Sequence, residues 1–274
     1  MKKSIPIEKL ICPQCKSANT LTFSEIEFQC LKCKKKIPGE KDFIDFVGKS
    51  ARKNFNLSQW AMEFSPIVFI YENIWRPMVT IPFSDYEWEK KKILNMLELE
   101  NCQSVLDIAC GPGNFTRLIS DNCKNRNSEI VGVDLSVPML KKAVTNNKNQ
   151  KYSHIIFMRA NVLQWNFAPE SFDRIHCAGA LHLFPEIQNV FHSIAKTLKP
   201  NGIFAGATYI KKTATGKILK NALEPFLKFH WFEPEELQEL ASNAGLVQWE
   251  HQIKKQGIVF RVRKKELAQN CCRS

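Results

Sequence analysis

The sequence predicts an α/β protein with a Rossmann-like, mostly parallel seven-stranded sheet, helices on both faces of that sheet, and a small N-terminal zinc ribbon. After Gln103, apolar segments typical of strands alternate with segments of helical periodicity, the pattern of a parallel sheet covered on both faces. Before residue 48, two Cys-x-x-Cys pairs flank a segment that alternates like a β-hairpin. These two patterns define the expected architecture.

The chain divides into three regions by composition. Its 274 residues are enough for one complete α/β core and a small additional module. Residues 1–48 form the expected ribbon, and residues 49–84 are an aromatic, proline-interrupted segment that we expect to be a helical linker or lid. Residues 85–274 form the large domain, which begins with Asp85 as the N-cap of a helix extending to about Leu99.

The composition argues against some classes of protein and leaves others open. No apolar run is long enough for a transmembrane helix, and the N-terminus lacks the apolar core of a signal peptide, so we expect a cytoplasmic protein. The net charge of +12 and the basic segments at residues 32–36, 89–92 and 261–266 are compatible with a polyanion-binding surface. Because runs of charge are more often solvated faces, RNA binding stays an alternative.

Four cysteines have the spacing of a metal site: Cys12 and Cys15 in CPQC, and Cys30 and Cys33 in CLKC. A two-residue spacing lets both thiolates of a tight turn reach one ion, and two such turns complete a tetrahedral four-cysteine site. A thioredoxin-like motif would instead use one pair at the start of a helix, and disulfides are uncommon inside cells. A site closed by four cysteines makes the expected zinc ion structural and not catalytic.

A glycine-rich turn is the first candidate ligand site. The segment VLDIACGPGNFTRLI runs from a strand through this turn into a helix. A dinucleotide fingerprint would need a third glycine where Thr116 stands, and Pro112 has no N–H for a pyrophosphate. Asp107, at the end of the strand, suits a cation better than a diphosphate. The turn therefore favours a ligand with a ribose and a positive centre over NAD.

The next two strands end in residues suited to a nucleoside. The second strand ends in Asp134, whose carboxylate can accept hydrogen bonds from both ribose hydroxyls. After the third strand, Asn161 can reach the exocyclic amine of an adenine, with Leu135 and Val162 as apolar neighbours of the ring. Because ligands of such sheets bind at the carboxyl ends of the strands, we expect these residues to share one site.

Five motifs in this order resemble the class I S-adenosylmethionine-dependent methyltransferases, especially the branch of ubiquinone and menaquinone biosynthesis: VLDIACGPGNF, VGVDLSVPML, ANVLQW, FDRIHCAGALHLFP and LKPNGIF. The resemblance extends from about Asp85 to the end of the chain. In that family the glycine turn lies under the methionine part of the cofactor, the acid after the second strand holds the ribose, and an acid after the third strand contacts adenine; Asn161 replaces that last acid here. The predicted cofactor-binding residues are Asp107, Ala109, Gly111, Gly113, Asp134, Leu135, Asn161, Val162 and Cys177.

The N-terminal half carries a second resemblance. CPQC and CLKC followed by DFIDF and FSPIVFIYENIWRP are similar to zinc-ribbon methyltransferases of cyanobacterial and plastid type. A ribbon also precedes this fold in a bacterial ribosomal-RNA guanine-N1 methyltransferase. That enzyme uses a histidine as one metal ligand, whereas the fourth position here is Cys33, so the similarity to it is partial.

His182 is the candidate catalytic residue. It follows the fourth strand, where it could deprotonate a hydroxyl or enol near neutral pH, or could simply bind a loop carbonyl. His230 and Trp231 form a second polar and aromatic cluster that could line the substrate side. Cys177 is not preceded by proline, which argues against a covalent cytosine mechanism and favours a packed core thiol.

These features lead to one functional hypothesis and two alternatives. The leading hypothesis is an S-adenosylmethionine-dependent methyltransferase acting on a small, apolar or aromatic metabolite, with a structural zinc ion. The first alternative is an RNA-base methyltransferase whose basic ribbon binds phosphates. The second is a cofactor-binding scaffold that docks a protein partner through the ribbon.

Overall fold

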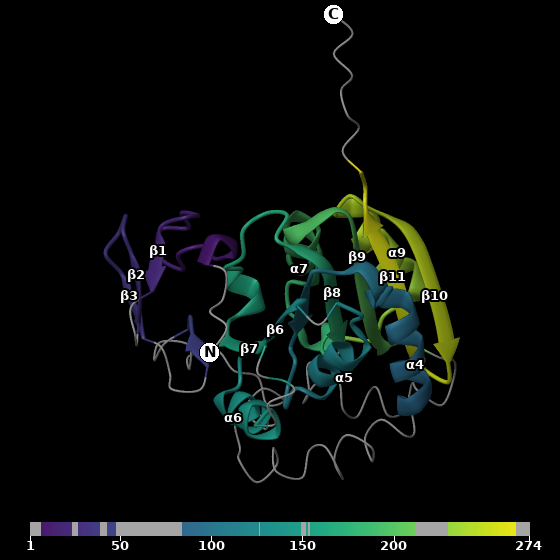
Figure 1. Ribbon diagram of the computed structural model, residues 1–274. Helices are drawn as coiled ribbons and strands as arrows, with labels where there is room; N and C mark the ends of the chain where they lie inside the picture. The colour runs from purple at the N-terminus through teal and green to yellow at the C-terminus, as the bar shows by residue number, and fades with distance from the viewer. Residues whose placement is uncertain are drawn as a thin grey trace, which may run out of the picture.

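The computed structural model describes residues 7–23, 27–38, 43–47, 84–125, 127–148, 152, 154–211 and 230–266 (Figure 1). The predicted linker or lid lies outside the described residues, apart from Ser84.

The N-terminal module is a small antiparallel sheet next to the large domain. Its elements are a 3-10 turn η1 (Ile7–Lys9) and the strands β1 (Leu21–Phe23), β2 (Glu27–Cys30) and β3 (Lys36–Pro38). The strands pair in the order β1, β2, β3, and Leu21 lies opposite Cys30. The hairpin expected between the two cysteine pairs is therefore confirmed.

The large domain is built on one twisted sheet. Its strands are β4 (Ile44–Asp45), β5 (Ser104–Ile108), β6 (Glu129–Asp134), β7 (Ile155–Arg159), β8 (Phe172–Ala178), β9 (Leu198–Tyr209), β10 (Leu246–Lys254) and β11 (Gly257–Lys264). They are ordered β10, β11, β9, β8, β5, β6, β7, β4. Neighbouring strands from β4 to β9 pair in parallel, and β11 pairs antiparallel with both β9 and β10. The predicted Rossmann-like sheet is confirmed.

The sheet has one strand more than the seven expected. β4 comes from the N-terminal region and pairs in parallel with β7, with Asp45 beside Arg159. A strand of two residues has no periodicity that a sequence could reveal, because alternation needs several residues. The N-terminal region thus contributes an edge strand to the large domain.

Helices cover both faces of the sheet. They are α4 (Tyr86–Leu97), α5 (Asn114–Asn122), α6 (Val137–Asn146), α7 (Ile187–Thr197) and α9 (Pro234–Asn243), with 3-10 turns η4 (Leu99–Asn101), η6 (Val162–Gln164) and η7 (Leu181–Leu183). Helices α4, α5 and α6 share one apolar cluster, and α7 and α9 share the other. As expected, Asp85 caps α4 by accepting a hydrogen bond from the backbone N–H of Trp88 at 3.0 Å.

The N-terminal module packs on the connection between β7 and β8. Leu10, which is fully buried, forms an isolated antiparallel bridge with Phe167. Lys9 lies 2.9 Å from Glu129 at the start of β6, with both side chains mostly buried. The apolar cluster of α7 and α9 includes residues of both the module and the sheet, so the two regions share a core.

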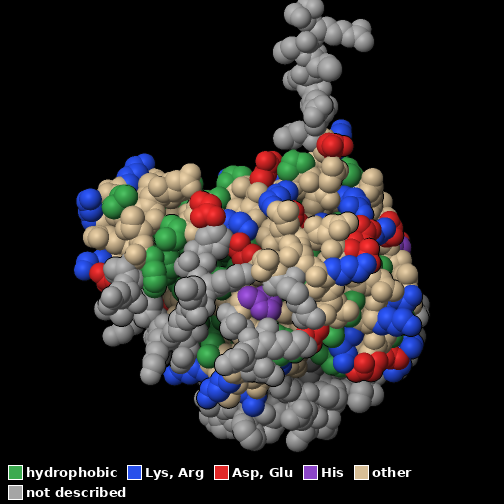
Figure 2. Space-filling view, viewed as in Figure 1, with side chains coloured by type: hydrophobic (Ala, Val, Ile, Leu, Met, Phe, Trp, Pro, Cys, Tyr) green, Lys and Arg blue, Asp and Glu red, His purple; other side chains and the backbone are tan. Residues whose placement is uncertain are grey.

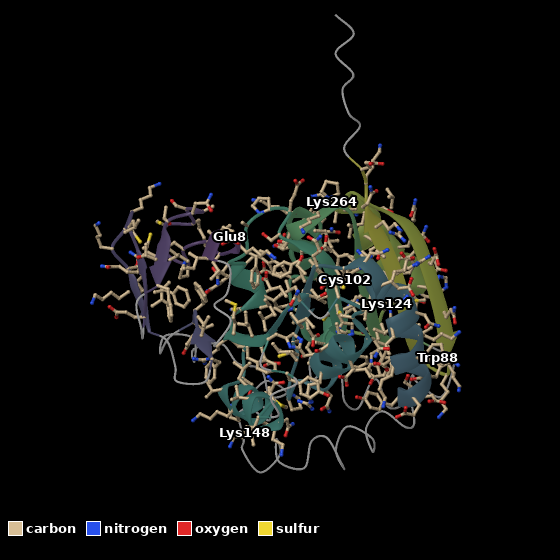
Figure 3. All side chains as sticks on the ribbon, viewed as in Figure 1. Glu8, Trp88, Cys102, Lys124, Lys148 and Lys264 are labelled. Atoms are coloured by element: carbon tan, nitrogen blue, oxygen red, sulfur yellow. The ribbon has the colours of Figure 1, made fainter. Side chains whose placement is uncertain are left out.

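Basic side chains are dispersed over the molecule. On the face shown in Figure 2, Lys and Arg lie at the outer end of the module and in separate groups on the large domain, with Asp and Glu among them. Lys124, Lys148 and Lys264 lie on different parts of the large domain (Figure 3). The net charge of +12 is therefore not concentrated in one region of this face.

The basic segment at 261–266 is largely paired within the chain. Arg261 and Arg263 both contact the carboxylate of Glu98. The ammonium of Lys264 lies 3.2 Å from a carboxylate oxygen of Glu170. Charges that are already paired offer less attraction to phosphates, so this segment gives little support to RNA binding.

Candidate functional site

The glycine turn connects β5 to α5 at the carboxyl edge of the sheet. Gly111 and Gly113 have φ angles of +54° and +81°, and Ala109 has a φ of +53°. This left-handed conformation favours glycine because it has no Cβ. The N–H of Cys110 donates to the carbonyl of Val133 at 2.9 Å, which ties the turn to the adjacent strand. Within the part of the chain that the structure describes, a Cβ at Gly111 would meet nothing within 4 Å.

We expect Gly113→Ala to lower the free energy of unfolding by about 2–3 kcal/mol, from left-handed strain plus crowding. A Cβ at Gly113 would lie 3.1 Å from the ring of Phe157. Gly245 is the matched control, because it has a φ of +78° and a Cβ there would meet no described residue within 4 Å. Urea unfolding should give Gly245→Ala a loss of only about 1–2 kcal/mol from strain alone. Equal losses would show that Phe157 does not constrain the turn.

Asp107 is held by the chain itself. The hydroxyl of Thr116 donates to Oδ2 at 2.6 Å, and Nδ1 of His176 lies 2.7 Å from Oδ1. Asp107 and His176 are each 1% exposed. Both carboxylate oxygens are thus engaged, and Asp107 fixes the first turn of α5 against β8. Thr116, which stands where a dinucleotide fingerprint would have its third glycine, is the residue of α5 that binds Asp107.

Asp134 joins the turn to the end of β6. The backbone N–H groups of Gly111 and Ser136 donate to its two carboxylate oxygens at 2.8 and 2.9 Å. Burial raises the pKa of Asp134 to about 6, against the lowering effect of these hydrogen bonds. Each carboxylate oxygen can accept a further hydrogen bond, so the pair of acceptors remains suited to a diol.

The pKa of Asp134 predicts a pH dependence of nucleoside binding. The ionised carboxylate accepts hydrogen bonds from the ribose hydroxyls. It becomes protonated as the pH falls through about 6, and the acid form is a poorer acceptor. We expect the affinity for S-adenosylhomocysteine to be roughly tenfold lower at pH 5 than at pH 7.5, following the ionised fraction. Calorimetric titration at both pH values measures this. Asp134→Asn should bind weakly at both, and a tenfold step that persists in this variant would assign the titration to another group.

The remaining predicted nucleoside residues lie beside Asp134. Asn161 is the N-cap of η6, and its side-chain oxygen accepts from the N–H of Leu163 at 3.0 Å. Leu135 and Val162 are half-buried on the two adjacent connections. Cys177, by contrast, is fully buried in the apolar cluster of α7 and α9, and burial raises its pKa well above the usual value. The structure therefore places Cys177 in the core.

His182 lies in η7 among aromatic residues. It is 5% exposed, and its Nδ1 is 3.3 Å from the hydroxyl of Thr208. The N–H of His230 donates to the carbonyl of His182 at 3.0 Å, and Tyr209 lies between His182 and Trp231 in ring contacts of 5.3 and 6.3 Å. Burial and the nearby His230 lower the pKa of His182 to about 3. A neutral imidazole of such low pKa is a weak proton acceptor.

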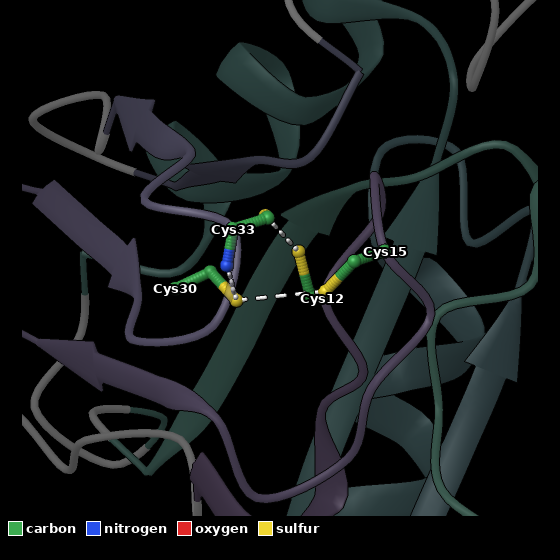
Figure 4. A group of neighbouring side chains, drawn as sticks. All are labelled: Cys12, Cys15, Cys30 and Cys33. Atoms are coloured by element: carbon green, nitrogen blue, oxygen red, sulfur yellow. Dashed lines mark hydrogen bonds between the residues drawn. The ribbon is translucent and has the colours of Figure 1, made fainter.

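The four cysteines of the N-terminal module converge on one point (Figure 4). Their sulfur atoms all lie within 4.8 Å of one another; Cys12 and Cys33 are 3.6 Å apart, and Cys15 and Cys30 are 3.7 Å apart. Four thiolates bound tetrahedrally at the usual Zn–S length would be roughly 3.8 Å apart. The backbone N–H of Cys33 points to the sulfur of Cys30 at 3.5 Å. This donor set fits a tetrahedral ion of zinc type.

The structure also contains site residues that the sequence patterns did not reveal. His176 supports Asp107 from the neighbouring strand, and its buried Nε2 has no hydrogen-bond partner among the described residues. Arg159 donates from Nε to the carbonyl of Leu135 at 2.9 Å. Both contacts depend on which strands are neighbours, so no local motif could have indicated them.

Known proteins with similar sequences are methyltransferases. The model of a methyltransferase-domain family matches residues 105–202. An uncharacterized chloroplastic methyltransferase of Arabidopsis thaliana is 27% identical over 241 residues, covering 82% of this chain and 67% of the plant protein. Demethylmenaquinone methyltransferase of Bacillus licheniformis is 26% identical over 133 residues, covering 48% of this chain and 56% of the bacterial protein.

Solved structures show the same fold. Phosphoethanolamine N-methyltransferase 2 of Haemonchus contortus, in complex with S-adenosyl-L-methionine, matches 74% of this chain and 58% of its own chain, with a TM-score of 0.60 at 16% identity. The family match and the relatives indicate the same activity. The chain is an S-adenosylmethionine-dependent methyltransferase.

Proposed function

We propose that this methyltransferase acts on a small, apolar or aromatic metabolite and binds its cofactor at the carboxyl edge of β5, β6 and β7. The observation that carries the site is the hydrogen bond from Gly111 to Asp134, which brings the glycine turn and the candidate ribose acceptor together. Two relatives support the substrate class, because their names give demethylmenaquinone and a sterol as acceptors. Both names denote compounds with apolar rings.

Six of the predicted cofactor-binding residues have a role in this proposal. S-adenosylmethionine supplies an electrophilic methyl group when it is bound. Gly111 and Gly113 let the backbone approach the methionine part, and Asp134 accepts hydrogen bonds from the ribose hydroxyls. Asn161 accepts from the adenine amine, and Leu135 and Val162 enclose the ring. Most of the rate would then come from positioning the acceptor in line with the methyl group and excluding water.

Of the two roles that the sequence left open for His182, a general base or a hydrogen-bonding residue, we assign it the second. A base of pKa about 3 would rarely hold a proton during turnover near neutral pH. Its contacts with Thr208 and with the backbone of His230 suit a residue that shapes the end of β9.

We also propose that the four-cysteine cluster binds a structural zinc ion. The ion would have four protein ligands and no position for substrate, so its contribution would be to the folding of the module. Cys12 and Cys30 are fully buried beside residues of the large domain, which gives the cluster a role in joining the two regions.

Neither alternative function has comparable support. For RNA binding, Arg261, Arg263 and Lys264 of the segment at 261–266 are paired internally. Lys36 lies 2.8 Å from Glu27. Exposed lysines remain at 34 and 35, at the outer end of the module. A scaffold role would need a defined docking surface, and the contacts of the described residues supply no argument for one.

Label transfer separates these functions. The purified chain is incubated with methyl-radioactive S-adenosylmethionine and an extract of cells lacking its gene, and RNA, protein and organic-soluble fractions are counted. We expect counts in the organic-soluble fraction, unchanged when Lys34 and Lys35 are replaced by Glu. Counts in RNA that are sensitive to ribonuclease and lost in that variant would replace the proposal with the RNA alternative.

The cellular location stays a prediction. None of the helices in the described part of the chain is long and apolar enough to cross a membrane. The Arabidopsis thaliana relatives carry names that place them in the chloroplast, whereas the sequence led us to expect the cytoplasm. Imaging of the tagged chain in its own cells would decide between these locations.

A further inference from the structure

A row of charged side chains crosses the carboxyl ends of three neighbouring strands. Asp134 on β6 is in register with Arg159 on β7, and Arg159 is in register with Asp45 on β4. Residues in register on parallel strands point to the same face of the sheet. Asp45, from the N-terminal region, therefore lies two strands from the candidate ribose acceptor, with Arg159 on the strand between them.

The contacts of Asp45 and Arg159 are specific. Oδ2 of Asp45 lies 3.2 Å from Nη1 of Arg159, and the two side chains are 11% and 7% exposed. Oδ1 of Asp45 accepts from the N–H of Val47 at 2.8 Å, and the N–H of Phe46 donates to the carbonyl of Arg159 at 2.9 Å. The guanidinium is thus fixed on one side by the edge strand.

The other side of the same guanidinium holds the nucleoside connection. Nε of Arg159 donates to the carbonyl of Leu135, the residue that follows Asp134. The N–H of Ala160 donates to the carbonyl of Asp134 at 3.1 Å. The planar fork of arginine can satisfy a carboxylate and a carbonyl in one fixed orientation, which lysine cannot do. The position of the Asp134–Leu135 backbone therefore depends on the orientation that Asp45 gives to Arg159.

We propose that Asp45 is a positioning residue for S-adenosylmethionine binding: through Arg159 it holds the Asp134–Leu135 backbone in the orientation that accepts the ribose and adenine. This inference rests on the proposed cofactor site. Under this inference, the edge strand β4 contributes to the proposed cofactor site through Asp45. Removing one member of a buried ion pair destabilises the charge that remains, and here Arg159 would pass this effect to the backbone that it contacts.

The test compares two ion pairs that join the N-terminal region to neighbouring strands, Asp45 with Arg159 on β7 and Lys9 with Glu129 on β6. Asp45→Asn removes the charge near the carboxyl end of β6, where Asp134 lies. Lys9→Met breaks the pair with Glu129 at the opposite end of β6. Full-length variants are titrated with S-adenosylhomocysteine, and their thermal unfolding is recorded. We expect Asp45→Asn to raise Kd about tenfold, equivalent to about 1.4 kcal/mol, and Lys9→Met to change it less than twofold.

Two further measurements distinguish a specific effect of Asp45 on cofactor binding from a general loss of stability. In label transfer, Asp45→Asn should raise the KM for S-adenosylmethionine and leave the rate at saturating cofactor within twofold of wild type. The double variant Asp45→Asn with Arg159→Met should bind no more weakly than Arg159→Met alone, because the two residues act in series. Additive losses would overturn the inference.

The outcomes also separate this inference from the proposed site. An unchanged Kd in Asp45→Asn, or an equal rise in Lys9→Met, would overturn the role of Asp45 while leaving the site intact. Normal binding by Asp134→Ala would instead reject the proposed site itself.

Discussion

Replacement of Asp134 by Ala is expected to abolish measurable binding of S-adenosylhomocysteine. Two charge-assisted hydrogen bonds to the ribose would be lost, worth together about 3 kcal/mol or more, which corresponds to a rise in Kd of roughly 100-fold or more. The same change releases the N–H of Gly111, so the glycine turn also loses one of its links to β6. Calorimetric titration of the full chain measures the effect.

Asp121→Ala is the matched control for this prediction. Asp121 lies on α5 and accepts a hydrogen bond from the hydroxyl of Tyr152 at 3.0 Å, away from the carboxyl edge of β6. It should bind S-adenosylhomocysteine within twofold of wild type. Circular dichroism of both variants verifies that the fold is retained. A folded Asp134→Ala protein with wild-type affinity would falsify the assignment of Asp134.

Loss of one cysteine ligand is expected to unfold the N-terminal module. Cys33→Ser should reduce bound zinc from one ion per chain to none, because a small module draws on the order of 10 kcal/mol of its folding free energy from such an ion. Elemental analysis after dialysis measures the metal, and limited trypsin digestion at the exposed Lys34 and Lys35 measures the unfolding. Removal of the ion from wild type by a chelator should have the same effect.

Cys123→Ala is the control for the metal site. Cys123 is a buried thiol at the end of α5, 3.5 Å from the sulfur of Cys102 and apart from the four-cysteine cluster. This variant should keep one zinc ion per chain and an intact module even if the large domain loses some stability. Zinc-free wild-type protein with a protease-resistant module would show that the cysteines need no metal.

Much of the fold could be predicted from the sequence because its signals are local. The strands β5 to β9 appear as apolar runs, the cap of α4 as Asp85 before a helical pattern, and the small hairpin as alternation between cysteine pairs. Each of these depends on a few consecutive residues whose preferences agree with the final structure. The two-residue strand β4 lacked such a signal.

The polar contacts of the site could not be predicted, because their partners lie far apart in the sequence. Asp107 and His176 are separated by 69 residues, and Asp45 and Arg159 by 114. Such pairs depend on strand order and register, which a single sequence does not specify. The low pKa of His182 likewise comes from burial, a property of the assembled fold. The motif residues could be named in advance, but not the residues that hold them in place.

The most direct test of the central claim, that the glycine turn and Asp134 bind S-adenosylmethionine, is a crystal structure of the full chain with S-adenosylhomocysteine. We expect the ribose hydroxyls within about 3 Å of the Asp134 carboxylate, at hydrogen-bond distance. We expect the adenine between Leu135 and Val162, with its amine near Asn161. A nucleoside bound elsewhere, or a ribose that does not contact Asp134, would contradict the proposed site.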